Sequence, residues 1–128
     1  MPPRSRTERA ENETAFVRRL LVALGSRKEL RVWRQNVGTI VLRDEMGEVD
    51  RVFRGGPPPG AADISGIVIG SGRRIEIECK TGGYKRNEDQ LAWADFISKS
   101  GALYELATDA ESVETIAKRV IERARSGR

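Results

Sequence analysis

Residues 73–80 form the segment that most restricts what this chain can fold into. Glycine-containing breakers at 70–72 and 81–83 bound it, and between them apolar residues alternate with charged ones. Successive side chains point to opposite faces of a β-strand, so this spacing predicts a strand with one apolar face and one charged face. The charged face carries Glu76, Glu78 and Lys80. Because such a face does not help a sheet to pack, it is a candidate for chemistry.

The remaining pattern predicts one α/β domain over residues 1–128, with a central mixed sheet flanked by helices. Apolar residues spaced three and four apart predict helices over 8–24, 88–100 and 110–125, the last two capped by Asn87 and Asp109. Besides 73–80, β-prone runs predict strands over 31–36, 39–43, 49–53, 64–69 and 102–107. Residues 31–53 are expected to form a β-meander or an irregular hairpin. Residues 1–7 and 126–128 are expected to be flexible ends, the first of them basic.

Composition removes several classes of active site. The 128 residues include no histidine and a single cysteine, Cys79. Histidine-based nucleophilic catalysis, histidine-ligated zinc and an internal disulfide are therefore excluded. Cys79 points away from the charged face and is expected to be a core thiol, and Trp33 and Trp93 are also expected in the core. No apolar run is long enough for a membrane span or a signal peptide, which predicts a soluble cytoplasmic protein.

The charge distribution suits a polyanionic partner. The net charge is +4, and 18 of the 23 basic residues are arginine, whose planar guanidinium binds phosphate well. Residues 1–34 carry a net +5 and residues 118–128 a net +4, whereas residues 35–117 carry a net −5. Basic ends around an acidic centre favour nucleic-acid binding next to a metal site. The alternative explanation is ordinary surface charge that keeps the protein soluble.

The predicted site joins Asp63 to the charged strand. A tight turn at 70–72 makes a hairpin of its flanking strands, and Asp63 and Glu78 lie about equally far from that turn. Their carboxylates, with the backbone carbonyl of Cys79, are expected to hold Mg²⁺. Lys80 is expected to contact a phosphate and the attacking water, either transferring a proton or stabilising charge. Glu76 is expected at the periphery, as a supporting group or as solvated surface.

These residues carry a resemblance to a known superfamily. Gly60-x-x-Asp63 followed by Glu78-Cys79-Lys80 resembles the PD-(D/E)XK nucleases, and the ordered set of motifs is similar to the stand-alone, phage-type members of the VRR-NUC family. The supporting motifs are Arg34-x-Asn36-x-Gly38, Gly60-Ala61-Ala62-Asp63-Ile64-x-Gly66, Thr81-Gly82, Gln90 and Gly101-Ala102-x-Tyr104. The likeness covers residues 8–110, and Ala62 replaces the proline of the superfamily motif.

The resemblance implies a restriction-endonuclease-like core and a Mg²⁺- or Mn²⁺-dependent endonuclease acting on duplex, flapped or branched DNA. It also implies a homodimer, acting in the host cell where such a protein is phage-encoded. It adds a glutamate from the first helix to the metal site, for which Glu13 is the first choice and Glu11 the second. Gln90 is expected to orient a phosphate or Lys80. Lys85 and Arg86 are expected to contact the DNA backbone.

Other functions stay open at this level. A nucleic-acid-binding module without catalysis would share the basic ends and the arginine excess. A structural subunit that dimerises through its helices would show no salt-dependent DNA affinity. Within the nuclease hypothesis, Holliday-junction resolution competes with flap cleavage and nicking.

Overall fold

A computed structural model of the chain describes residues 6–36 and 38–127. Its elements, in order, are α1 (Arg6–Gly25), β1 (Leu30–Arg34), β2 (Gly38–Arg43), β3 (Val49–Gly55), β4 (Ile64–Val68), β5 (Arg74–Lys80), α2 (Glu88–Lys99), β6 (Leu103–Thr108) and α3 (Val113–Ser126). This order confirms the predicted sequence of helices and strands. Of the predicted flexible ends, residues 1–5 and 128 lie outside the described residues, while Arg6 and Thr7 open α1.

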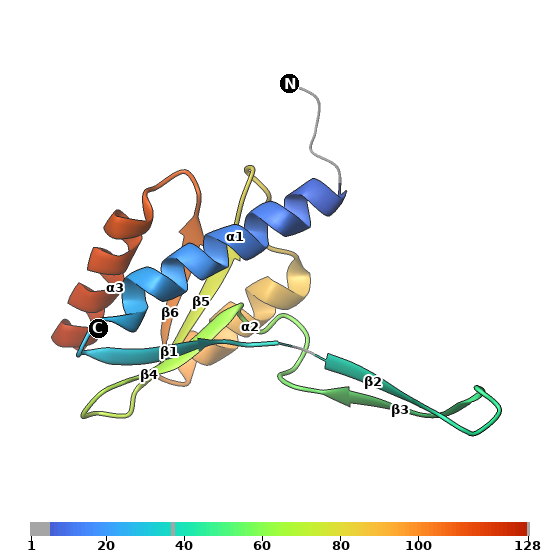
Figure 1. The fold of residues 1–128 in the computed structure, drawn as a ribbon. Helices are drawn as coiled ribbons and strands as arrows, with labels where there is room; N and C mark the ends of the chain where they lie inside the picture. The colour runs from blue at the N-terminus through green and yellow to red at the C-terminus, as the bar shows by residue number, and fades with distance from the viewer. Residues whose placement is uncertain (1–5, 37, 128) are drawn as a thin grey trace.

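The central sheet has four strands in the order β1-β4-β5-β6. β4 pairs antiparallel with both β1 and β5, whereas β5 and β6 run parallel and are joined through α2. The predicted mixed sheet of a single α/β domain is therefore confirmed. β1 pairs with β4 rather than with β2, so a meander is wrong, whereas the alternative of an irregular hairpin is confirmed for β2 and β3, whose register shifts between Leu42 and Arg43. β2 and β3 instead form a separate two-stranded hairpin that extends away from the main sheet (Figure 1).

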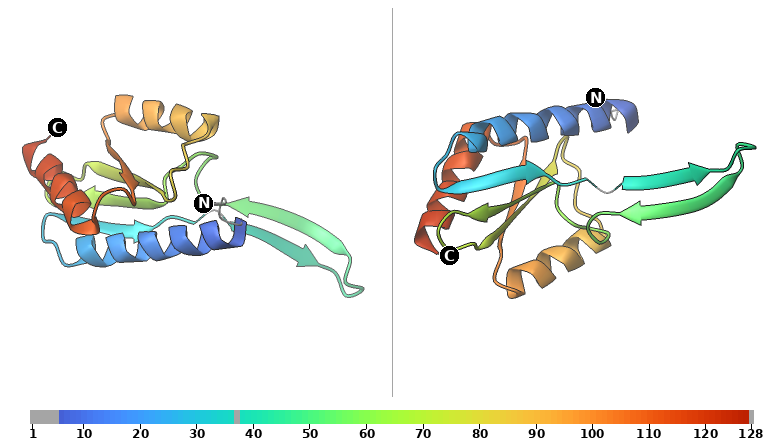
Figure 2. Two further views of the ribbon diagram at one scale, coloured as in Figure 1. Left: turned by 90° about the horizontal axis from the view of Figure 1, so that it is seen from above. Right: turned by 60° about the horizontal axis from the view of Figure 1, so that its bottom comes forward.

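Helices cover both faces of the central sheet. α1 and α3 lie on one face and α2 lies on the other (Figure 2). The α1/α3 side holds the apolar core, where Ile75, Ile77 and Cys79 of β5 are fully buried. Phe16, Leu20, Leu24, Ile116 and Val120 pack into the same core from the two helices. The strand alternation read from residues 73–80 thus separates an apolar face toward α1 and α3 from a charged face toward α2.

The N-terminal cap of α2 is the predicted residue, but that of α3 is not. Asn87 caps α2 as predicted, with its side chain accepting a hydrogen bond from the Gln90 amide. α3 is capped by Ser112 and not by Asp109, because the chain makes a further turn before the helix begins. Both carboxylate oxygens of Asp109 instead accept from the Gly82 amide at 3.2 Å. Asp109 therefore fixes the turn that follows Lys80.

Among the described residues, no helix combines the length and the apolar character needed to cross a bilayer.

Candidate active site

The β4–β5 hairpin brings Asp63 to the charged end of β5. Ile64 lies opposite Ile77, so the same register places Asp63 beside Glu78. The Asp63 carboxylate accepts a hydrogen bond of 2.9 Å from the Cys79 backbone amide. Its backbone carbonyl accepts another, of 2.8 Å, from the Gln35 amide at the end of β1. Asp63 is thus fixed from both neighbouring strands, at the position that the equal distances from the turn predicted.

Glu78 is the centre of the cluster. Its side chain is buried, and its Oε1 accepts a 3.2 Å hydrogen bond from Gln90 Nε2 and lies 3.7 Å from Lys80 Nζ. Its other oxygen, Oε2, is buried and receives no hydrogen bond from a donor group, and the Glu78 side chain instead meets the Asp63 carboxylate. Gln90 was expected to orient a phosphate or Lys80, but the group that it contacts is Glu78. The side-chain amide of Gln90 therefore links the first turn of α2 to the Glu78 carboxylate on β5.

The surroundings of Glu78 favour the protonated form of its carboxyl group. Burial raises the pKa of Glu78, and the neighbouring Asp63 carboxylate raises it further, to about 8. Lys80 lowers the pKa and only partly offsets these effects, while the charge of Glu13 raises it. Two adjacent carboxylates in a poorly hydrated site repel one another unless a cation or a proton lies between them. The site therefore favours capture of one or the other.

The loop before Asp63 depends on Gly60. This residue has a φ of +87°, a region that disfavours residues with a side chain. A Cβ atom there would lie 2.2 Å from the Asp89 carbonyl oxygen in the first turn of α2. The loop and the helix can meet this closely because residue 60 has no side chain. This contact packs the segment that leads into Asp63 against the helix that supplies Gln90.

A pocket of about 250 Å³ opens at the C-terminal end of β5. It is lined by Glu13, Lys80, Thr81, Tyr84, Lys85, Asn87 and Gln90. Thr81 contributes a buried hydroxyl without a hydrogen-bond partner. The pocket thus gathers residues of α1, β5, α2 and the loop between β5 and α2. Lys80 is placed at its edge, 15% exposed, where an incoming anion can reach its ammonium group.

The structure places Glu13, the first choice for the helix acid, in this pocket; the side chain of Glu11 lies outside the described residues. Across the described ranges, no group of three or more Asp, Glu or Cys side chains is close enough to hold a metal ion. Glu13 therefore acts on Glu78 through its charge and does not form a three-carboxylate cluster with Asp63 and Glu78. The expected role of the Cys79 carbonyl stays a prediction; the backbone amide of Cys79 donates a hydrogen bond to the Asp63 carboxylate.

The Cys79 side chain is fully buried among the core residues on the opposite face, as the strand alternation predicted. Burial raises the pKa of the thiol well above its usual range, and the charges of Asp63 and Glu78 raise it further. The thiol therefore stays protonated and is not a nucleophile.

Glu76 corrects the expectation of a solvated or peripheral side chain. It is completely buried between β5 and α2. Its two oxygens accept hydrogen bonds from Trp93 Nε1 at 2.6 Å and from Gln35 Nε2 at 3.1 Å, and Arg74 lies 3.5 Å away. A buried carboxylate needs such donors, because its desolvation is costly. Glu76 thus ties α2 and the end of β1 to the strand that carries the site.

The tryptophans were predicted less well than the acids. Trp93 is half-buried and its indole N–H serves Glu76, while Trp33 is 45% exposed at the sheet edge, so its expected place in the core is wrong. Gln35 and Trp93 carry no signal of a supporting role in the sequence. Only the unusual need of a buried glutamate for donors, once the fold is known, identifies them.

Replacement of Trp93 by phenylalanine is expected to lower the free energy of unfolding by about 2 kcal/mol, because Glu76 loses a donor to a buried charge. Urea denaturation measures this change. Phe96→Leu is the matched control, since Phe96 contacts the Trp93 ring but is 59% exposed. An equal loss in both variants would contradict a specific role for the indole N–H.

A basic surface adjoins the pocket. A second hollow of about 400 Å³ shares Lys80, Tyr84 and Lys85 with it and is further lined by Arg86, with apolar walls that include Leu106. The Arg86 guanidinium lies 5.9 Å from the Tyr104 ring centroid, which holds it beside the sheet. The expected contacts of Lys85 and Arg86 with DNA are untested, but both residues line a hollow that Lys80 also lines.

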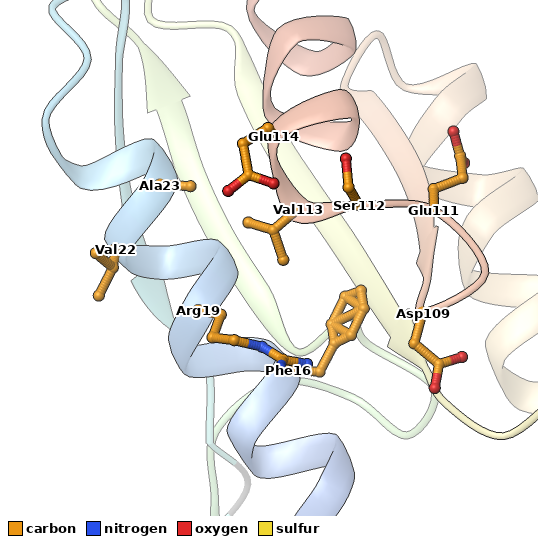
Figure 3. A pocket seen from close by; sticks show the side chains of 9 residues that line it. All are labelled: Phe16, Arg19, Val22, Ala23, Asp109, Glu111, Ser112, Val113 and Glu114. Atoms are coloured by element: carbon orange, nitrogen blue, oxygen red, sulfur yellow. The ribbon is translucent and has the colours of Figure 1, made fainter.

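A hollow of about 600 Å³ lies elsewhere, between α1 and the segment that joins β6 to α3 (Figure 3). Three carboxylates line it, but two already have structural partners: Asp109 accepts from Gly82, and Glu111 is paired with Arg119 at 2.7 Å. Arg119 also binds Glu105 at 2.6 Å, which fastens α3 to β6. This hollow therefore lacks the unpaired buried carboxylate oxygen that marks the β5 site.

Comparison of the chain with models of known protein families and with curated protein sequences finds no match. The function is therefore inferred from the geometry of the site and from the resemblance of its motifs.

Proposed function

We propose that the chain is a metal-dependent endonuclease that hydrolyses phosphodiester bonds of duplex, flapped or branched DNA. The observation that carries this proposal is the position of the Asp63 carboxylate next to the Glu78 carboxylate and Lys80. One oxygen of Glu78 is buried there and receives no hydrogen bond from a donor group. Together with the four-stranded mixed sheet, this arrangement supports the restriction-endonuclease-like core that the resemblance implies. A module that only binds DNA has no need of two adjacent carboxylates at the end of a buried strand.

The residues present fit a hard divalent cation. Asp63 and Glu78 supply oxygen ligands, which Mg²⁺ and Mn²⁺ prefer, and burial together with the adjacent Asp63 carboxylate raises the pKa of Glu78. When bound, such an ion polarises the phosphate and lowers the pKa of a water molecule. The Glu78 carboxyl gives up its proton as the ion enters, so affinity for the ion rises with pH.

Each remaining side chain has a task in this proposal. The Lys80 ammonium group neutralises charge on the phosphate oxygens in the transition state, because it lies at the pocket edge next to Glu78. Gln90 holds the Glu78 carboxylate in one orientation from the first turn of α2. Glu13 adds negative charge that strengthens the attraction for a cation. No histidine is available, so the attacking water gives its proton to Lys80 or to solvent water, and the leaving oxygen takes one from solvent water.

The DNA backbone is proposed to lie along the surface of Lys80, Lys85 and Arg86, which face the two adjoining hollows. Binding through these charges weakens as salt increases, because counterions are released from the phosphates. A substrate panel of supercoiled, flapped and four-way-junction DNA, incubated with Mg²⁺ or Mn²⁺, tests the activity. Absence of cleavage on every substrate with both metals would contradict the proposal.

Asp63→Asn is expected to weaken Mn²⁺ binding by more than about 100-fold, because one of the two charged ligands becomes neutral. Isothermal titration calorimetry with Mn²⁺ alone measures this without any DNA. Asp95→Asn is the matched control, since Asp95 is exposed on α2 and pairs with Lys99. Equal Mn²⁺ affinity of Asp63→Asn and wild type would place the metal elsewhere.

A further inference from the structure

The hollow of about 400 Å³ beside the proposed active site has walls that phosphate binding does not explain. We call it the side hollow. Its lining combines three cations with an aromatic ring and two leucines: Lys80, Lys85, Arg86, Tyr84, Leu91 and Leu106. Cations alone would suffice to hold a DNA backbone, whereas the ring and the leucines suit a flat apolar group. The volume is within the range of about 300–1,000 Å³ that is typical of sites for small organic groups.

The floor of the side hollow continues the row of residues that forms the proposed active site. In the parallel pairing of β5 and β6, Leu106 lies beside Glu78 and Thr108 lies beside Lys80. Partners in register point to the same face of a sheet, and neighbouring strands lie about 4.8 Å apart. Leu106 and Thr108 both line the side hollow, which is therefore one strand away from the acid and the lysine.

Two further segments form its walls. α2 packs on β6, and Leu91, near the start of that helix, keeps 49% of its surface exposed. Tyr84 comes from the loop between β5 and α2, and it lines both the side hollow and the pocket that contains Glu13 and Gln90. A group bound in the side hollow therefore lies against Tyr84, next to a phosphate at Lys80.

The charges of the side hollow fit a neutral group that is joined to a phosphate. Lys80, Lys85 and Arg86 supply the positive charge, and Arg86 lies 5.9 Å from the Tyr104 ring centroid. Asp109 also lines the hollow, but both of its carboxylate oxygens accept from the Gly82 amide. A nucleotide has the matching form, because a single sugar joins its flat, neutral base to its charged phosphate.

A base can reach the side hollow only when it is unpaired. In a duplex the bases face one another near the helix axis, and the phosphates form the outer surface that Lys80 and Lys85 would contact. A base that enters the hollow has therefore left the stack. Leaving the stack requires more free energy for a paired base than for a base in a flap or a bulge.

We propose that the side hollow binds one unpaired nucleobase of the DNA strand whose phosphate lies at Lys80. The inference rests on the proposed function, because the hollow adjoins the reacting phosphate only if that phosphate lies at Lys80. The base is held by stacking on Tyr84 and by contact with Leu91 and Leu106, which every base can make. The side hollow thus selects DNA with an unpaired nucleotide at the cleavage site over continuous duplex, without regard to its sequence.

Removal of a single base from the DNA tests this proposal. Flapped DNA is made with an abasic tetrahydrofuran residue in place of each unpaired nucleotide near the junction in turn. Fluorescence anisotropy without metal then measures affinity while no cleavage occurs. At one of these positions, loss of the base is expected to weaken binding to wild type about 10-fold, as the loss of one stacked base does. Equal affinity at every position would overturn the proposal.

Leu91→Asp tests whether the side hollow is the place where the base binds. The variant is expected to bind base-containing and abasic DNA equally well, because its carboxylate lies in the apolar wall. Phe96→Asp is the matched control and is expected to keep the preference, since Phe96 is also exposed on α2 but is not a lining residue. The ratio of the two affinities cancels the general repulsion between a new carboxylate and DNA. A Leu91→Asp variant that keeps the full preference and, by circular dichroism, the fold would also overturn the proposal.

Cleavage of the same DNA with Mn²⁺ separates this inference from the proposed function. Cleavage by a wild type whose affinity is the same with and without the base would overturn the side-hollow proposal and leave the nuclease intact. Base-dependent binding with no cleavage by either metal would contradict the nuclease and support the base site.

Discussion

Replacing Lys80 with alanine is expected to reduce the kcat of DNA cleavage by roughly 100- to 1,000-fold, the range measured when one charge-stabilising donor is removed from an active site. The side chain lies 3.7 Å from the Glu78 carboxylate at the edge of the pocket and can reach a phosphate there. The substitution is not expected to unfold the protein, because Lys80 is partly exposed and belongs to no apolar cluster. Nicking of supercoiled DNA under single-turnover conditions measures the loss.

Two further lysines give matched controls. Lys85→Ala is expected to weaken DNA affinity a few-fold with little change in kcat, since Lys85 lines the same pocket but does not contact Glu78. Lys99→Ala is expected to change neither quantity, because its side chain is 76% exposed and pairs with Asp95 on α2. Cleavage by Lys80→Ala at the wild-type rate would show that Lys80 does not take part in the reaction, and would contradict the proposed site.

In metal-free protein, the free energy of unfolding is expected to depend on pH through the raised pKa of Glu78. The pKa of Glu78 is about 8 in the folded protein and 4.5 without perturbation. Between these values the folded state binds more protons than the unfolded state, so the free energy of unfolding falls as pH rises. Below pH 4.5 and above pH 8 this group has no further effect. The decrease over the window is expected to be about 3 to 5 kcal/mol, because each pH unit between the two pKa values corresponds to about 1.4 kcal/mol.

Glu78→Gln is expected to remove this dependence, because a neutral amide does not repel Asp63. The variant is expected to be more stable than wild type at pH 8 by about 3 kcal/mol and similar to it at pH 5. Urea denaturation at both pH values, in the presence of a chelator, measures the difference. Addition of Mn²⁺ at pH 8 is expected to stabilise wild type but not Glu78→Gln. A variant that is equally destabilised at both pH values would show that Glu78 carries no electrostatic strain.

The geometry around Asp63 and Glu78 could be predicted because it depends on local rules. A glycine turn fixes the hairpin, and the strand period of two then determines which residues share a face. The equal distances from the turn gave the observed register, with Ile64 opposite Ile77. The capping of α2 by Asn87 was predictable for the same reason, since a cap requires only neighbouring residues.

The surroundings of the site depend on contacts between distant segments. Glu76 looked like a surface acid, but Trp93 and Gln35 supply the donors that allow its burial. The sequence contains no record of which donors will meet a given carboxylate, because those residues are 17 and 41 positions away. Trp33 was misplaced for a similar reason: α2 lies over β5 and β6 and leaves Trp33 on β1 exposed, which no local pattern predicts.

The sequence by itself determined the order of helices and strands, the hairpin that joins Asp63 to Glu78, and the absence of histidine chemistry, since each depends on residue type and short-range spacing. The tertiary structure alone decided that β1 pairs with β4, that β2 and β3 form a separate two-stranded hairpin, and that Glu76 is buried. The physical reason is that strand partners and burial are chosen by the free energy of the whole packed sheet. Alternation within a strand states which residues share a face, but not what covers that face.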